Sequence, residues 1–167
     1  MRQLTVFSPT TFLMEHSLLM DAQPLIMCVM GERVMVLIFF FIYVCLFTYS
    51  NVCVPFDEFT MGMLRTLNVA PTQLQPNSWA PLRAFRLLVE MFWLKSSPHV
   101  FLHFYSSRLA QPVRWLSLVS QAVVALFTPF CSPYKYFKNV FFKISIKSTG
   151  RHYFFNGDTP KFPLYWT

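Results

Sequence analysis

With 167 residues the chain is long enough to bury a core of its own, and one domain is expected. Hydrophobic residues make up 54% of it and charged residues only 13%, so its mean hydropathy of +0.42 is high for a soluble domain. Its four cysteines have no CxxC spacing and its four glycines form no phosphate-binding loop, which argues against a zinc framework, a disulfide scaffold and a P-loop.

The net charge of +7 is unevenly distributed along the chain. Residues 1–80 carry three Arg against five acidic residues, a net −2, whereas residues 81–167 carry eleven Lys and Arg against two acidic residues, a net +9. A basic half of this kind occurs in proteins that bind nucleic acid or an anionic surface. It also occurs as the solvated face of an ordinary small domain, because charge asymmetry alone is a weak signal.

Residues 1–33 contain no recognised motif, and charged residues interrupt their apolar positions, so the compact layout of a signal peptide is missing. Val34 to Val54 then runs without a charge over about the length that a bilayer crossing needs. Arg33 at its entrance favours a transmembrane helix. The polar TYSN break and the many β-branched and aromatic residues favour a buried core element. We expect the core element and keep membrane insertion as the alternative.

Pro55 ends this run, and a short amphipathic helix is predicted next. Asp57 and Glu58 fall in its first turn, where carboxylates oppose the positive end of the helix dipole, and the helix should end near Asn68. Thr60, Arg65 and Thr66 are expected to face outward. Helical spacing predicts an apolar face formed by Phe56, Phe59, Met63, Leu64 and Leu67.

The following VAPTQLQPN segment is expected to be an extended linker, because the residue before a proline avoids the helical region. A second helix should begin with Asn77 or Ser78 as its cap and with Pro81 in or next to its first turn. This helix is expected to pack on the first, with Arg83, Arg86 and Glu90 off the contact. Its apolar face is predicted to consist of Trp79, Leu82, Phe85, Val89 and Phe92.

After Lys95 the pattern changes to short aromatic and β-branched runs, which predict strands. In KISIK, Lys143, Ser145 and Lys147 alternate with two isoleucines, the signal of a half-buried strand. The fold class is therefore α+β, with early amphipathic helices packed on a small, mostly antiparallel sheet. The expected strands are Val100 to Tyr105, Trp115 to Val119, Val123 to Thr128, Asn139 to Ile146 and His152 to Phe155.

Ordered blocks of this sequence are shared with a known family. They include the stretch from VPFDEF at Val54 to RAFRLL ending at Leu88, then WLSLVS, LFTPF, YKYFKNVFFKI and KFPLYWT. Through these blocks the chain, from about Phe39 to its end, resembles a domain of plant proteins of the gypsy-type retrotransposon class. Gln75 and Pro81 depart from the family's pattern. The motif positions are Asn68, Pro71, Pro76, Asn77, Trp79, Pro163 and Trp166.

The resemblance implies a genomic origin rather than a mechanism. It assigns residues 55–167 to the transposon-associated domain and leaves residues 1–33 and 34–54 as separate segments. Because relatives continue past the YWT motif, the chain is expected to be a truncated copy.

No catalytic constellation can be assembled from the sequence. Only Asp158 follows Lys95, so carboxylates for two-metal chemistry are scarce, and Asp57 and Glu58 are explained as helix-start residues. His99 and His103 would share a face if their segment were helical, but no third ligand lies nearby. We expect no enzyme activity, no cofactor and no metal.

Lysines and aromatic residues interleave from Tyr134 to Lys147. Lysines neutralise phosphates and aromatic rings stack on unpaired bases, so this is the composition of a weak single-strand nucleic-acid binder. We favour the alternative that the run is a sheet with its aromatic residues in the core and its lysines on the exposed side. The candidate contacts for nucleic acid are Lys135, Lys138, Lys143, Lys147, Tyr134 and Tyr136.

The leading prediction is a non-enzymatic, retrotransposon-derived plant domain with a role in interaction or assembly. Nucleic acid and self-association are the candidate partners, and a nuclear or cytoplasmic location is favoured. The first alternative is a weak nucleic-acid-binding module that uses the basic aromatic half. The second is a small single-pass membrane protein anchored by Val34 to Val54.

Overall fold

The computed structural model describes residues 28–29, 34–35, 38–111, 114–127 and 140–167. Five α-helices and eight short strands lie in these ranges, with 3₁₀ turns at Ala122–Val124 and Ser148–Gly150. The helices are α1 Val44–Tyr49, α2 Glu58–Leu67, α3 Pro76–Met91, α4 Pro98–Phe104 and α5 Arg151–Phe154. The strands are β1 Cys28–Val29, β2 Val34–Met35, β3 Ile38–Tyr43, β4 Tyr105–Ala110, β5 Trp115–Ser120, β6 Phe141–Ile146, β7 Phe155–Asn156 and β8 Thr159–Pro160.

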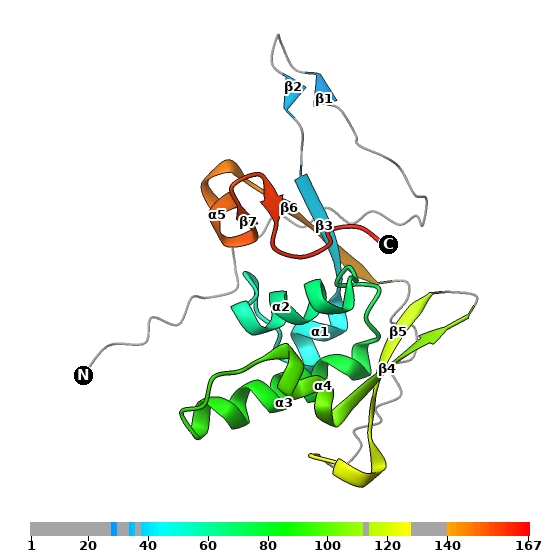
Figure 1. The fold of residues 1–167 in the computed structure, drawn as a ribbon. Helices are drawn as coiled ribbons and strands as arrows, with labels where there is room; N and C mark the ends of the chain where they lie inside the picture. The colour runs from blue at the N-terminus through cyan, green and yellow to red at the C-terminus, as the bar shows by residue number, and fades with distance from the viewer. Residues whose placement is uncertain (1–27, 30–33, 36–37, 112–113, 128–139) are drawn as a thin grey trace.

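The α+β class is confirmed, and the described strands pair only antiparallel. They form four separate two-stranded ladders, β1–β2, β3–β6, β4–β5 and β7–β8, instead of the single small sheet that was expected. A parallel bridge between Leu74 and Leu116 ties the segment before α3 to β5. The helices α1 to α4 gather on one side of the β3–β6 ladder, and the β4–β5 hairpin extends at the edge (Figure 1).

The β3–β6 ladder joins the apolar run to the C-terminal part of the chain, with Ile38 opposite Ile146 and Tyr43 opposite Phe141. Phe40 and Ile42 of β3 are completely buried, as is Leu46 of α1. These side chains share one hydrophobic core with α2, α3 and the residues up to Leu164. Within the described ranges, no helix has both the length and the apolar character for a membrane crossing.

The first predicted helix is confirmed as α2. Asp57 caps it by accepting a hydrogen bond from the Thr60 backbone N–H at 2.9 Å, and Asn68 ends it in the left-handed conformation at φ 52°. Thr60, expected to face outward, is buried instead, because its hydroxyl donates to the other Asp57 carboxylate oxygen at 2.9 Å. A satisfied hydroxyl can be buried at little cost.

The linker between α2 and α3 is folded rather than extended. Residues 69–74 are all buried, and a turn is closed by the Gln73 N–H donating to the Ala70 carbonyl at 2.9 Å. Pro76 is the first residue of α3, a position where its missing N–H costs no hydrogen bond, so the cap expected at Asn77 or Ser78 is wrong. The Ser78 hydroxyl instead accepts from the Leu118 N–H at 2.9 Å. Pro81 lies deeper in α3 than expected, inside the helix.

The predicted inner face of α3 is confirmed for Trp79, Leu82, Phe85 and Val89 but not for Phe92. The helix ends at Met91, and Phe92 is 64% exposed. Helical periodicity cannot place a residue once the backbone leaves the helix.

Three predicted strands are wrong. Residues 100–104 lie in α4, which begins at Pro98 and buries Phe101 against Phe85 and Tyr105. Residues 122–124 form a 3₁₀ turn, and residues 151–154 form α5. Aromatic runs fit a pleated surface, but tertiary packing overrides this preference. The strands predicted near Trp115 and at KISI are confirmed as β5 and β6.

Candidate functional site

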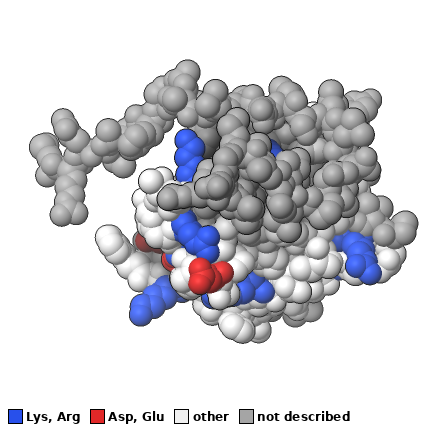
Figure 2. All heavy atoms as spheres, turned by 90° about the horizontal axis from the view of Figure 1, so that it is seen from above, with Lys and Arg blue, Asp and Glu red and all other residues white. Residues whose placement is uncertain are grey.

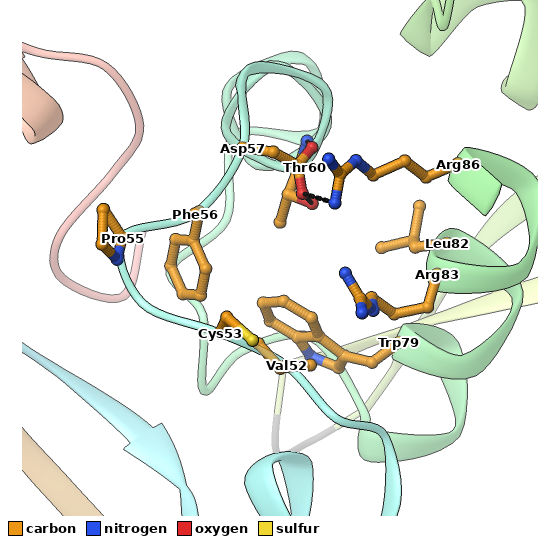
Figure 3. Close-up of a pocket in the computed structure, with 10 residues that line it drawn as sticks. All are labelled: Val52, Cys53, Pro55, Phe56, Asp57, Thr60, Trp79, Leu82, Arg83 and Arg86. Atoms are coloured by element: carbon orange, nitrogen blue, oxygen red, sulfur yellow. Dashed lines mark hydrogen bonds and ion pairs between the residues drawn. The ribbon is translucent and has the colours of Figure 1, made fainter. Parts of the chain in front are cut away.

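A pocket of about 270 Å³ opens between the loop that precedes α2 and one side of α3. Figure 3 shows Phe56 and Asp57 on the loop side, and Trp79, Arg83 and Arg86 on the α3 side. Ligand pockets usually have volumes of about 300–1,000 Å³, so this one fits a single side chain or a small anion better than a large cofactor.

Asp57 and Arg86 form one polar wall of the pocket. An Arg86 guanidinium nitrogen lies 3.4 Å from the Asp57 Oδ2 atom, and the same carboxylate caps α2 and accepts from the Thr60 hydroxyl. Both Asp57 oxygens are therefore occupied by structural contacts. The carboxylate is held in place by these contacts, and its ion-pair partner among the described residues is Arg86.

Arg83 is the unpaired charge of the pocket. Its guanidinium points into the hollow between the Trp79 ring and Arg86 in Figure 3. Among the described residues no carboxylate lies within ion-pair distance of it, whereas Arg86 has Asp57. A guanidinium carries five N–H donors in a planar fork that matches carboxylate and phosphate oxygens. The pocket therefore has an excess positive charge with free donors.

The pocket floor is aromatic. The Phe56 and Trp79 rings lie 5.6 Å apart between centroids, and Trp79 is almost fully buried. The Trp79 indole N–H has no hydrogen-bond partner in the described part of the chain. This nitrogen is itself fully buried, so it offers no donor to a ligand in the open pocket, and Arg83 supplies the free donors. An apolar floor also strengthens an ion pair by lowering the local dielectric.

Two titratable groups, at the end of β3 and in α1, are poor nucleophiles. Burial raises the pKa of the Cys45 thiol, and burial also raises the pKa of Tyr43 to about 12, so both remain protonated at neutral pH. Cys53 lines the pocket, and its thiol donates to the Asn51 carbonyl with a sulfur to oxygen distance of 3.7 Å. The geometry favours binding of an anion over covalent chemistry.

The residues predicted to bind nucleic acid are only partly described. Lys135, Lys138, Tyr134 and Tyr136 lie outside the described residues. Lys143 lies over the Phe39 ring at 4.3 Å, and Lys147 is exposed just after β6. On the face shown in Figure 2, the described Lys and Arg side chains do not merge into one continuous patch. Nucleic-acid binding through this segment stays a prediction.

A direct test of that prediction is single-stranded RNA binding at low salt. If lysines 135, 138, 143 and 147 contact phosphates, replacing all four by Gln should abolish a salt-sensitive, sequence-indifferent affinity. Fluorescence anisotropy of a labelled single-stranded RNA measures it, with Arg65→Gln as a single-charge control on the opposite half of the sequence. Absence of binding by the unmodified chain would contradict the prediction.

The family-motif residues converge on a structural contact rather than on the pocket. The Asn68 carbonyl accepts from the Thr167 hydroxyl at 2.6 Å, and the Trp166 indole N–H donates to the Thr72 hydroxyl at 2.9 Å. Pro71 and Pro76 lie on either side of the buried residues 72–74, and Pro163 lies between the buried Phe162 and Leu164. Trp79 is the motif residue that lines the pocket, whereas Asn77 does not line it.

Gln73 is the centre of this contact and was not singled out from the sequence. It is 3% exposed, and its side-chain amide donates to the Thr167 carbonyl at 3.3 Å and accepts from the Thr167 N–H at 3.3 Å. The same side chain also contacts Ala70 N–H and the Arg114 carbonyl. A glutamine between two prolines gives no sequence signal for burial.

His99 and His103 lie four residues apart in α4, so they share an exposed helix face. Among the described residues, no group of three or more His, Cys, Asp and Glu side chains is placed to hold a metal ion. The pocket that Arg83 lines, called here the Arg83 pocket, was not predicted from the sequence. Trp79, Arg83 and Arg86 lie at helical spacing, and this spacing could have suggested it.

Comparison with known proteins finds one family. Residues 42–109 match the family model described as "Putative gypsy type transposon". The match confirms the resemblance over this segment, which contains α1 to α4, most of β4 and the whole Arg83 pocket. No curated protein and no solved structure matches the chain.

Proposed function

We propose, starting from the gypsy-type transposon domain that matches residues 42–109, that the chain is a non-enzymatic interaction module of plant retrotransposon origin. Its binding site is the pocket beside α3, and the group it takes is an anion, a carboxylate or phosphate, carried by a partner. The observation that carries this proposal is the unpaired Arg83 guanidinium in an aromatic-floored pocket.

Three features of the pocket support anion binding over a purely structural role for Arg83. Among the described residues the guanidinium has no carboxylate partner, although Arg86 three residues along the same helix has one. The aromatic floor formed by Phe56 and Trp79 strengthens an ion pair with Arg83 by lowering the local dielectric. Among the described acidic side chains, Asp57, Glu58 and Asp158 already pair with Arg86, Lys161 and Arg151. A partner is therefore the proposed source of the anion.

Titration with inorganic phosphate and with glutarate tests the proposal. We expect the Nε–H NMR signals of Arg83 and Arg86 to shift with either anion, and the Arg86 signal remains as the reporter in Arg83→Ala. Arg83→Ala should weaken binding about 10-fold or more, because a hydrogen bond to a charged group is worth about 1.5–3 kcal/mol. The matched control is Arg65→Ala, which removes an exposed cation of α2 outside the pocket.

The relative response to the two anions identifies the partner's chemistry. A stronger shift with glutarate indicates an acidic side chain, and a stronger shift with phosphate indicates a phosphorylated or nucleotide group. Equal weak shifts in the unmodified chain and in Arg83→Ala would contradict the proposal, because the response would then come from general screening of the +7 charge.

A further inference from the structure

Helix α3 is apolar on its outer side as well as on its inner side. Leu87 and Met91 are 51% and 75% exposed, although a surface helix normally presents polar residues there. On the same side, Ala84 lies one turn and Ala80 two turns before Leu87, and both are half-buried. Two opposite apolar sides on one helix indicate that both sides are covered in the functional state.

The end of α3 adds a strained and exposed aromatic residue. Trp93 has φ 56°, and its N–H donates to the Glu90 carbonyl at 3.1 Å while the Leu94 N–H donates to the Val89 carbonyl at 2.8 Å. This hydrogen-bond pattern usually places Gly at the left-handed position, which is unfavourable for a bulky residue. Trp93 is also 95% exposed, so the monomer gains nothing from its indole ring.

Together these residues form one exposed apolar patch, named here the α3 outer surface: Leu87, Met91, Phe92, Trp93 and Leu94. Scattered exposed apolar residues need no explanation, but a contiguous patch with a strained tryptophan marks an interaction site. Aromatic and Met side chains are enriched at such sites.

We infer that the α3 outer surface binds the same surface of a second copy of this chain, with the two α3 helices antiparallel. This inference rests on the proposed function, because the anion that reaches Arg83 is then the Glu90 carboxylate of the other copy. Glu90 is exposed and has no ion-pair partner among the described residues.

Charge complementarity supports a second copy as the occupant. Arg83 and Glu90 are seven residues apart, which is about two turns or 10 Å along one side of α3. A two-fold axis midway between them places each Arg83 opposite the other copy's Glu90, so two ion pairs form at once. Such self-complementarity is what a symmetric dimer requires.

Side-chain size is complementary in the same arrangement. The small Ala80 and Ala84 lie toward the start of α3, and the large Met91 and Trp93 lie at its end. Antiparallel packing places the large end of each helix on the small end of the other. The net charge of +7 opposes the contact only weakly at physiological salt, where charges more than about 8 Å apart are largely screened.

Sedimentation equilibrium with charge exchange tests this inference. The unmodified chain is expected to dimerise, Arg83→Glu and Glu90→Arg are each expected to weaken the dimer at least 10-fold, and the double variant is expected to restore it. Lys147→Glu, an exposed charge reversal after β6, is the control that should leave the dimer intact. A monomeric unmodified chain, or a double variant no better than the single ones, overturns the inference.

Trp93→Gly separates loss of binding from loss of folding. Glycine suits the left-handed position, so this variant should stay folded, with an unchanged far-UV circular dichroism spectrum, while its dimer dissociates. A Trp93→Gly variant that dimerises as tightly as the unmodified chain overturns the inference. Phosphate and glutarate titration of this monomeric variant tests the pocket alone. If the Arg83 signal shifts but the unmodified chain does not dimerise, the proposed function stands and only the second copy as the source of the anion is ruled out.

Discussion

Replacing Phe40 by Ala is expected to lower the free energy of unfolding by about 3–5 kcal/mol, the usual cost of deleting a fully buried phenyl ring. Phe40 of β3 is completely buried, and its ring lies 5.5–5.7 Å between centroids from those of Phe56, Phe154 and Phe162. Phe40 therefore connects the apolar run to Phe56, which precedes α2, and to Phe154 and Phe162 in the C-terminal part of the core. The resulting cavity would have aromatic walls that cannot collapse easily.

Urea denaturation followed by tryptophan fluorescence measures this loss. Tyr153→Ala is the matched control, because it deletes an aromatic ring from a 50% exposed position outside the α3 outer surface and should cost much less than Phe40→Ala. Equal stability of Phe40→Ala and the unmodified chain would contradict the placement of the run in the core. That outcome would reopen membrane insertion of Val34 to Val54.

Replacing Gln73 by Leu is expected to cost about 2–3 kcal/mol, because several backbone groups lose a partner in a buried site. The Gln73 amide joins the turn after α2 to Thr167, which is 94 residues away. Its bonds are long, at 3.3–3.5 Å, and Thr167 is exposed enough for water to replace part of the loss. The expected cost is therefore below that of Phe40→Ala.

Hydrogen exchange at individual amides separates the hydrogen-bonding role of Gln73 from a general contribution to packing. Hydrogen exchange at the Thr167 and Ala70 amides should accelerate in Gln73→Leu more than exchange in the β3–β6 ladder. Gln75→Leu makes the same change two residues later, where the side chain has no hydrogen bond among the described residues, and should be nearly neutral. Equal effects of the two substitutions would show that the Gln73 network does not stabilise the C-terminal contact.

Asn68 and Trp93 show how far local sequence determines a helix end. Both stop a helix in the left-handed conformation, at φ 52° and 56°. Asparagine tolerates this conformation, so the end of α2 could be predicted from the sequence. Tryptophan does not favour it, and the predicted helix was extended one residue too far, to Phe92. Trp93, which departs from this conformational preference, is also a residue for which we infer a role in binding a second copy.

The candidate site was harder to predict than the fold, since its chemistry depends on which charges are already paired. Arg83 and Arg86 are equivalent in the sequence, three residues apart on one helix. Only the packing of α3 against the start of α2 brings Asp57 to Arg86 and leaves Arg83 without an ion-pair partner in the described part of the chain. The nucleic-acid prediction, in contrast, rests on residues of which four lie outside the described ranges.

Local sequence is sufficient to predict the α+β class, the two central helices, the first of them with its start at Asp57 and its end at Asn68, and the resemblance of residues 42–109 to the gypsy-type transposon family. These features follow from local periodicity, capping chemistry and motif order, which act within a few residues. Tertiary contacts are needed to make the aromatic runs at 100–104 and 151–154 helical, to bury the Pro-rich linker, and to leave Arg83 without an ion-pair partner among the described residues. Each of these depends on contacts between segments far apart in the chain, such as Gln73 with Thr167, and local propensity is too weak to fix them.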